Sequence, residues 1–489
     1  KLGKTDIIKD TDGVLSLDIP PEETHDGAIR TLNEDLLPAM KEVGDKFGSG
    51  ELILPFVLKS AECMKASVGE LEKYLVKEEG TSKGVLVLGT VYGDVHDIGK
   101  NLVKTIFQNN GYSVHDLGKQ VPLQKFLEKI DEVKPDAIGL SALLVSTSKQ
   151  MKLFVEHARK NNMTTPILCG GAAINSNYIN RIAKEDGIYE PGVFYCNTMF
   201  EGLKTMDVLI SDEKPKLLAD WKEKLENWKE KSTATIDPDT LPKSETRSVQ
   251  APTPKVIGEP IRLKLDQINM AEVWTMIDKK SLFKLSWGLR GKAGSESEDE
   301  HEQLLTEWKI RIIRDKLFEP EIVYGYFKCH NKDRKLLVEN PTGDDVELEF
   351  PRSTRPDHLC LTDYFGDDDI VAFQSVTVGN KVAEIIEQWN KEDKYTDAYY
   401  LHGLAVEVAE ALAEWVNQKI KSELSLEKGG LRYSWGFPSC PDVAQHHLVW
   451  KLLQPEKSGM TLTESGQIIP EQSTAAIVIH HPDAKYFVL

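Results

Sequence analysis

The arrangement most able to do chemistry in this chain is a histidine between two aspartates, in the run Asp94-Val95-His96-Asp97. It follows a predicted strand over 85–88 and opens a predicted helix. In an open α/β sheet ligands bind in the crevice outside the carboxyl ends of the strands, so we expect the imidazole of His96 to project there. One ring nitrogen can bind a metal ion, while the other can donate to Asp94, which fixes the tautomer. Gly99 lets a bulky group pass close to the backbone.

The alternative is that His96 is an ordinary surface or hydrogen-bonded loop residue, because a single Asp-x-His-x-x-Gly pattern has low specificity. The surrounding pattern favours a ligand site. Strands and helices are predicted to alternate, which is typical of a doubly wound domain with a parallel sheet. The predicted strands are 85–88, 113–117, 137–141, 166–169 and 193–195, and the predicted helices include 102–107, 126–130 and 151–160.

Two amphipathic patterns precede this domain. Apolar residues recur at helical spacing from Leu32 to Phe47, and again from Leu54 to Leu75 after the break Gly48-Ser49-Gly50. Taken alone, they predict a helical bundle whose apolar faces form a core.

The run from Gly93 to Asn101 resembles the cobalamin-binding signature of the methionine synthase family. The resemblance implies a flavodoxin-like domain in which His96 becomes the lower ligand of cobalt after the cofactor's dimethylbenzimidazole tail swings away. It implies catalytic roles for Asp94 and for Thr147, which stands where the family usually has serine. The further cobalamin-binding residues that it implies are Gly93, Val95, Asp97, Ile98, Gly99, Ser141, Leu143, Val145, Gly170, Gly171 and Thr198.

The helical region is similar to the cap of the same family. The run from Val43 to Pro55 matches its Val-Gly-Asp-x-Phe-Gly-x-Gly-x-x-x-Leu-Pro pattern. The resemblance implies that Phe47, Leu54 and Val57 shield the methyl group of methylcobalamin. A dry lid suits a reactive organocobalt centre, since exclusion of water prevents side reactions.

Composition restricts the class of protein. The 489 residues suffice for about three domains. The net charge of −18 argues against nucleic acid as the main partner. The sequence shows neither a long apolar run nor a secretory signal, so we expect no membrane span and no export. The six scattered cysteines favour reduced thiols in the cytoplasm. The pairs His446-His447 and His480-His481 lack partners at zinc-ligand spacing.

The segment from Ser232 to Pro254 has the composition of a linker, and an α+β domain is expected after it. Within that domain Glu410 and Glu414 lie one turn apart on a predicted helix over 405–420, and a glycine- and proline-containing loop begins at Arg432. By themselves these residues indicate only a solvated helix face and a surface salt bridge.

Residues from about 256 onward resemble the activation domain of the cobalamin-dependent methionine synthases, which binds S-adenosylmethionine. The matches, in family order, are Ile277-Asp278 with 287–292, Ala409 to Glu414, the loop from Arg432 to Pro441, Leu462 to Ser465, and Lys485-Tyr486-Phe487. The resemblance implies that Asp278, Glu410, Arg432, Ser434, Gly436 and Tyr486 bind S-adenosylmethionine. The segment from Gly466 to Ala476 departs from the Ala-Met-x-Pro pattern of the family.

These features predict a helical cap (1–80), a flavodoxin-like cobalamin domain with a trailing helix (81–231), a linker (232–255) and an S-adenosylmethionine-binding reactivation domain (256–489). The resemblance implies the C-terminal part of a methyltransferase that moves a methyl group from methyltetrahydrofolate to homocysteine through cobalamin. It also implies a flavodoxin-like electron donor, N-terminal homocysteine and folate modules of the same protein, and zinc only in the homocysteine module. The absence of an initiator methionine suggests a fragment. The alternative is a corrinoid carrier or cobalamin sensor without enzymatic activity.

Overall fold

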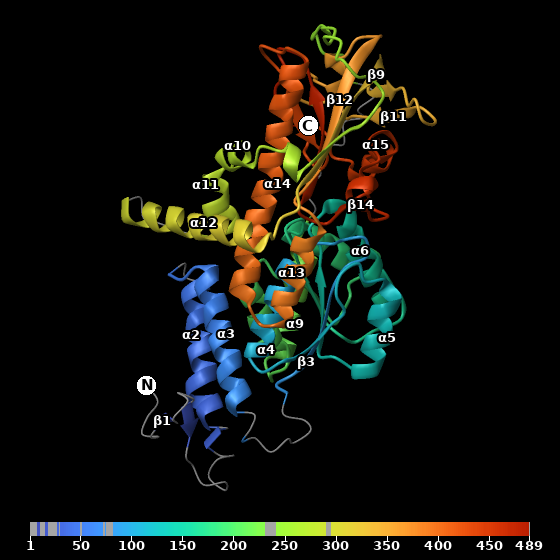
Figure 1. Ribbon diagram of the computed structural model, residues 1–489. Coiled ribbons are helices and arrows are strands. Elements are labelled where there is room, and N and C mark those ends of the chain that lie inside the picture. Colours follow the sequence, from blue (N-terminus) through green and yellow to red (C-terminus); the bar gives the residue numbers. More distant parts are fainter. Residues whose placement is uncertain are drawn as a thin grey trace.

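Three groups of elements follow one another along the chain (Figure 1). The structure is a computed structural model that describes residues 7–9, 15–17, 27–28, 30–48, 51–71, 74, 82–229, 241–289 and 295–488. Leu75, residues 232–240 of the predicted linker and 290–292 of a matched motif lie outside this range. A short hairpin, β1 (Ile7–Lys9) and β2 (Leu15–Leu17), comes first.

The middle group is a parallel sheet with the order β4-β3-β5-β6-β7, which is the flavodoxin-like arrangement expected from the sequence. The five predicted strands are confirmed, with ends that move by at most two residues. Their bounds are β3 (Val85–Thr90), β4 (Ser113–Asp116), β5 (Ala137–Ser141), β6 (Ile167–Gly170) and β7 (Val193–Tyr195). Because both faces of the sheet are covered by helices, β3, β5, β6 and β7 are short apolar runs rather than alternating patterns, whereas the edge strand β4 is mostly polar and half-buried.

Side chains on the two faces of β3 enter different cores. Val87 packs with the helices α5 (Leu123–Val133), α6 (Val145–Lys160) and α7 (Ser176–Lys184). Leu86 and Leu88 pack on the other side with α4 (Ile98–Asn109) and α8 (Met199–Leu209). The helix α9 (Lys214–Asn227) follows. Because all five strands are parallel, their carboxyl ends lie along one edge of the sheet.

The N-terminal helical region comprises the π-helix η1 (Thr31–Leu36), α2 (Leu37–Gly48) and α3 (Leu54–Leu71). Its buried residues Met40, Val57 and Met64 share one apolar core with α4 and α8. In Figure 1 the two long helices stand beside the parallel sheet domain, next to α4. The helical region is therefore attached to the side of that domain by ordinary apolar packing.

The C-terminal group contains an antiparallel sheet with the order β11-β10-β9-β12-β16-β13, and β8 pairs with β9. The strands are β8 (Ile261–Lys264), β9 (Glu321–Lys332), β10 (Lys335–Val338), β11 (Val346–Glu349), β12 (Asp369–Thr377), β13 (Leu431–Ser434) and β16 (Ser473–Ile479). A small hairpin, β14 (Thr461–Leu462) and β15 (Ile468–Ile469), lies apart from the sheet. In Figure 1 the hairpin strand β14 lies at the boundary with the parallel sheet domain.

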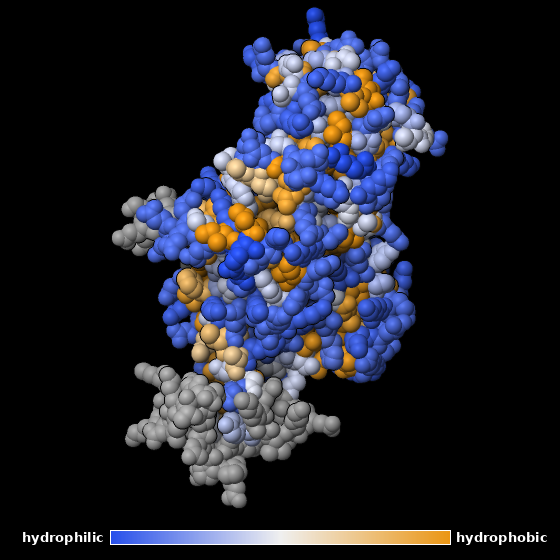
Figure 2. Space-filling model, in the orientation of Figure 1, coloured by the Kyte–Doolittle hydropathy of each residue, from blue (hydrophilic) through white to orange (hydrophobic). Residues whose placement is uncertain are grey.

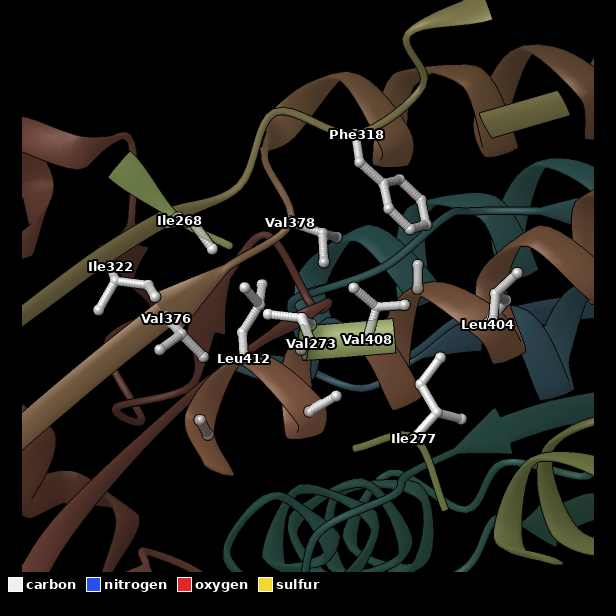
Figure 3. Close-up of a cluster of buried hydrophobic side chains, with 14 of the residues drawn as sticks. Ile268, Val273, Ile277, Phe318, Ile322, Val376, Val378, Leu404, Val408 and Leu412 are labelled. Atoms are coloured by element: carbon white, nitrogen blue, oxygen red, sulfur yellow. The ribbon is translucent and has the colours of Figure 1, made fainter. Parts of the chain in front are cut away.

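Alternating residues of β9 separate two cores in this domain. Ile322, Tyr324 and Tyr326 face the core drawn in Figure 3, where they meet residues of the long helix α14 (Tyr395–Glu423). Val323 and Phe327 face the other core, beside α15 (His446–Leu453). The remaining helices are α10 (Met270–Thr275), α11 (Lys279–Ser281), η4 (Leu282–Ser286), α12 (Ser295–Asp315) and α13 (Asn380–Lys391), with short 3-10 turns η3 (Leu265–Gln267), η5 (Leu361–Tyr364), η6 (Val443–Gln445) and η7 (Pro455–Ser458).

Part of the predicted linker is attached to the C-terminal domain. His480 and His481 bond through Nε2 to the carbonyl oxygens of Val249 and Arg247, at 2.5 and 2.8 Å. The backbone N–H of Ala251 donates to Asp369 at 2.8 Å. The segment around residues 247–251 thus extends this domain at its N-terminal side.

The visible surface is mostly hydrophilic, with separate hydrophobic patches (Figure 2). Within the part of the chain that the structure describes, no helix combines the length and the apolar character that crossing a bilayer requires.

The helical region also contacts the start of α14. The carboxylate of Glu62 accepts a hydrogen bond from the backbone N–H of Thr396 at 2.8 Å, in the first turn of α14. Lys65 pairs with Asp393 just before that helix. Lys394, the N-cap residue of α14, makes no side-chain capping bond. A carboxylate favours a helix N-terminus, so α14 is capped by another part of the chain.

This contact predicts the behaviour of Glu62→Ala. Loss of a capping bond costs about 1 kcal/mol. This raises the equilibrium constant for local opening of the first turn of α14 roughly fivefold, so amide exchange there should accelerate by that factor. Hydrogen exchange mass spectrometry of the peptide that contains Thr396 measures it. Glu42→Ala, which removes a pair with Lys46 within α2, is the control. Equal exchange in Glu62→Ala and the parent would contradict the capping role.

Candidate functional site

His96 lies between β3 and α4, at the carboxyl edge of the parallel sheet. Its Nδ1 is 2.9 Å from the carboxylate of Asp94, and its backbone N–H donates to the same oxygen at 3.0 Å. The second oxygen of Asp94 accepts from the hydroxyl of Thr147 at 2.6 Å and from the backbone N–H of Leu143 at 2.8 Å. The structure therefore brings His96, Asp94 and Thr147 together, with the Nε2 of His96 left to meet a ligand.

These contacts control the charge of the pair. Burial by itself would raise the pKa of Asp94, but the hydrogen bonds from His96 and Thr147 outweigh burial and lower it to about 2. Burial also disfavours protonation of His96, yet the hydrogen bond to Asp94 and the charge of Glu471 raise its pKa above the ordinary value. Asp94 is thus a permanent carboxylate that makes the imidazole more basic.

The other residues expected to bind cobalamin line the same edge of the sheet. Asp97 is the N-cap residue of α4, Ser141 ends β5, and Thr198 caps α8 by accepting from the N–H of Glu201. Leu143 and Val145 are exposed at the start of α6. The set is completed at this edge by Gly93, Val95, Ile98, Gly99, Gly170 and Gly171.

Two glycines test whether a large cofactor fits here. A Cβ atom at Gly99 would meet open space, so the backbone at the start of α4 is accessible to a bulky group. Gly171 has a φ of +125°, and a Cβ there would lie 1.9 Å from the carbonyl oxygen of Ala142. Only glycine lets the segment after β6 approach the segment after β5 so closely. The residues present fit a cofactor held by the imidazole and passing along the carboxyl edge.

The three residues expected to shield the methyl group lie elsewhere in this arrangement. Val57 is fully buried against the sheet domain, and Leu54 packs on the same core. The ring of Phe47 lies 5.3 Å from that of Phe200, which belongs to α8. None of the three lines the pocket beside His96.

The C-terminal domain covers that position instead. The hydroxyl of Ser465 donates to the carbonyl oxygen of Gly93 at 2.7 Å, and the side-chain oxygen of Gln467 accepts from the N–H of Val95 at 3.0 Å. Both belong to the segment that includes β14 and β15. Glu471 follows them, and its charge reaches both His96 and His402 of α14. Sequence reasoning named Ser465 only as part of a matched motif and missed Gln467 and Glu471, although it marked 466–476 as atypical.

A second cluster surrounds Arg432 on β13. Its guanidinium pairs with Glu410 at 2.6 Å and lies 3.6 Å from Glu414. Ser434 is 3.5 Å from the guanidinium, and the hydroxyl of Tyr486 donates to the carbonyl oxygen of Arg432 at 3.2 Å. Four of the six residues expected to bind S-adenosylmethionine therefore form one group, in which Arg432 is held by carboxylates.

The other two lie beside this group. Asp278 caps α11 and accepts from Ser281. Its charge also reaches Glu407, one turn before Glu410 on α14, where burial first and then the charges of Asp278 and Glu410 raise the pKa of Glu407. Gly436 has a φ of +100° in the loop after β13 and donates to the carbonyl oxygen of Cys440. The predicted helix over 405–420 is longer in the structure, because Ala398 and Leu401 extend its buried side.

Comparisons with known proteins agree with this organisation. Residues 269–489 match the family described as vitamin B12 dependent methionine synthase, activation domain. Residues 84–192 match a B12 binding domain, and residues 5–72 match a second family of that description. The chain belongs to the cobalamin-dependent methionine synthase family.

Methionine synthase of Mycobacterium tuberculosis is 33% identical over 536 residues, which cover 97% of this chain and 44% of that protein. The Mycobacterium leprae protein is 34% identical, covering 97% of this chain and 45% of its own length. The chain thus spans less than half the length of these relatives. A crystal structure of the MetH reactivation domain bound to AdoHcy has a TM-score of 0.42 and 20% identity, and covers 49% of this chain and 83% of that one.

The network around His96 predicts the effect of Asp94→Asn in this methionine synthase relative. The substitution removes the charge that favours imidazolium, so the pKa of His96 should fall and its proton should be lost at a lower pH. A pH titration of the His96 ring signals by NMR, on the full chain without cobalamin, measures this. Asp97→Asn serves as the matched control and should cause a smaller fall, because Asp97 acts through charge alone. An unchanged pKa in Asp94→Asn would refute the assigned coupling.

Proposed function

We propose that this chain holds cobalamin through His96 and restores its methylated form with S-adenosylmethionine, as part of a methionine synthase. When bound, cobalamin supplies a cobalt ion that passes a methyl group from methyltetrahydrofolate to homocysteine and that is remethylated after oxidation, with an electron from a flavodoxin-like donor. We assign the homocysteine and folate modules to the part of the relatives' length that this chain does not span. The observation that carries the proposal is the bonding of His96 to a fully buried carboxylate at the carboxyl edge of the sheet.

The chain's own groups do the following work. Asp94 accepts from Nδ1 of His96 and so keeps that nitrogen protonated, which presents Nε2 to cobalt. Thr147 and the N–H of Leu143 hold Asp94 in place and keep it ionised. Gly99, where a Cβ would meet open space, leaves the backbone at the start of α4 accessible to the displaced nucleotide tail, beside the closely packed segments after β5 and β6.

In the second cluster Arg432 pairs with the carboxylate of S-adenosylmethionine in place of Glu410. Glu410, once released, and Asp278 accept from the ammonium or ribose groups of this cationic ligand. Ser434 and Gly436 hold the adenine through the loop, and the ring of Tyr486, 5.1 Å from that of Tyr433, packs on the ligand.

The arrangement of domains supports the reactivation role. The C-terminal domain lies over His96, while Phe47, Leu54 and Val57 of the cap pack on α4 and α8. A second arrangement, in which these three residues cover the methyl group, requires the C-terminal domain to leave. The match of residues 269–489 to an activation domain favours this function over a corrinoid carrier or sensor.

The His96→Gly variant tests the cobalamin site. Cobalamin should still bind, because most of its contacts remain, but the visible spectrum should change to that of a form without a protein nitrogen ligand. Absorbance of the loaded full chain gives the answer, with His115→Gly, on β4, as a histidine control. A spectrum identical to that of the parent would rule out His96 as the cobalt ligand.

Arg432→Ala tests the second site. Removal of a charge-assisted pair of 1.5–3 kcal/mol should weaken S-adenosylmethionine binding by at least about tenfold. Arg432→Lys should recover only part of it, because lysine cannot form the bidentate pair. Calorimetry on the full chain measures the affinities, with Arg314→Ala on α12 as the control. If the parent binds no S-adenosylmethionine, the carrier or sensor alternative holds.

A further inference from the structure

A buried cation, Lys100, lies in the first turn of α4, close in sequence to His96. Its side chain is 1% exposed, and no other lysine among the described residues is buried. Its Nζ donates to the carboxylate of Asp116, the last residue of β4, at 2.6 Å and to the side-chain oxygen of Asn101 at 2.7 Å. Lysine is almost never fully buried unless it is paired, so the pair with Asp116 is what holds this ammonium inside the domain.

Stability alone is a weak reason for such a pair. Taking two charges out of water costs about as much free energy as their attraction returns, and apolar residues of similar volume often replace a buried ion pair without loss. A buried pair does disfavour other arrangements of its two elements, because they would leave a charge uncompensated. The contact between Lys100 and Asp116 therefore indicates that the position of α4 relative to the end of β4 matters for the site.

The loop after β4 connects this pair with the site. Asp116 also accepts from the backbone N–H of Gly118 at 2.9 Å. Further along the loop, the backbone N–H of Gln120 donates to the carbonyl oxygen of Asp94 at 3.1 Å. Gln120 has a φ of +53°, which is uncommon for a residue with a side chain. Surrounding contacts must hold the loop in this conformation, and the pair of Asp116 with Lys100 is one of them.

Asp94 is thereby held from two sides. Thr147 bonds its carboxylate from the first turn of α6, and Gln120 bonds its carbonyl oxygen from the loop after β4. The same loop accepts from the backbone N–H of Thr90, whose hydroxyl donates to the carbonyl oxygen of His96 at 3.4 Å. The backbone on both sides of Val95 thus depends on the position of this loop.

We propose that Lys100 is a positioning residue for the bond between His96 and cobalt. Its own bonds go to Asp116 and Asn101, so it acts through the loop after β4 and the backbone of Asp94. By holding that loop, it keeps the imidazole in the place where Nε2 meets the cofactor. The inference rests on the proposed function, because it concerns the strength of the bond from His96 to cobalt.

Lys104 offers a matched control. It follows Lys100 by one turn on α4 and reaches the other oxygen of Asp116, at 3.3 Å. Its side chain is 38% exposed, so water can take the place of its ammonium. Removing this cation should leave the loop after β4 in place.

The test compares Lys100→Met with Lys104→Met in the full chain loaded with methylcobalamin. Methionine keeps an unbranched side chain but has no charge. In Lys100→Met the displacement of His96 from cobalt should become at least about tenfold more favourable, because the mostly buried Asp116 loses its partner. The visible spectrum, followed as the pH is lowered, measures this displacement. The imidazole takes up a proton when it leaves cobalt, so a tenfold change raises the midpoint by about one pH unit.

The remaining variants separate positioning from a general loss of stability. Lys104→Met should keep the midpoint of the parent, and Lys100→Arg, which retains the charge, should restore part of it. Tyr189→Phe removes a buried bond to the carbonyl oxygen of Thr165 in the same domain and should also keep the parent's midpoint. If Lys100→Met does not fold, Lys100→Met combined with Asp116→Asn removes both charges and should raise the midpoint in the same direction.

Hydrogen exchange without cobalamin gives a second measurement. The peptide that contains Gln120 should exchange faster in Lys100→Met than in Lys104→Met, since only the first variant releases the loop. A parent-like midpoint in Lys100→Met, or in the double variant where that one does not fold, overturns the positioning role. An equal rise in Tyr189→Phe overturns it too, because displacement would then follow stability alone. A parent whose spectrum shows no protein nitrogen ligand would instead overturn the proposed function.

Discussion

The buried carboxylate of Asp94 is the constraint on which the rest of the site depends. It has no exposed surface, yet it is ionised, because its two oxygens accept from the side chain and backbone of His96, from Thr147 and from Leu143. An ion in such a place is tolerated only when every oxygen is satisfied. One group therefore ties the loop after β3 to the start of α6 and sets the orientation of the imidazole.

Much of this could be predicted from the sequence. Apart from the edge strand β4, the strands of the parallel sheet are short apolar runs between turn residues. The elements that carry Asp94, His96 and Thr147 are local, so spacing and family resemblance were sufficient to place them. Glu410 and Arg432 were also identified by resemblance. From the residues alone they suggested a solvated helix face and a surface salt bridge, and their 2.6 Å ion pair agrees with the salt bridge. The ligand proposed for them comes from the resemblance.

What could not be predicted depends on contacts between distant segments. Gln467 and Val95 are separated by 372 positions, and no periodicity in either segment indicates that they meet. The start of α14 was missed for a related reason. Its first turn is stabilised by Glu62 from the helical region, whereas its own N-cap residue, Lys394, contributes no capping side chain. Local capping signals are absent where a different domain supplies the cap.

The hydrogen bonds around His96 form two sets, one within the sheet domain and one that depends on the C-terminal domain. The bonds of Asp94 lie within the sheet domain and do not depend on what covers it. The bonds from Ser465 and Gln467 reach only backbone groups, the carbonyl of Gly93 and the N–H of Val95. When the C-terminal domain leaves, water can replace these partners at a net cost of about 1 kcal/mol each. The geometry of the imidazole is thus retained while the domain above it exchanges, which is what a site that serves two partners in turn requires.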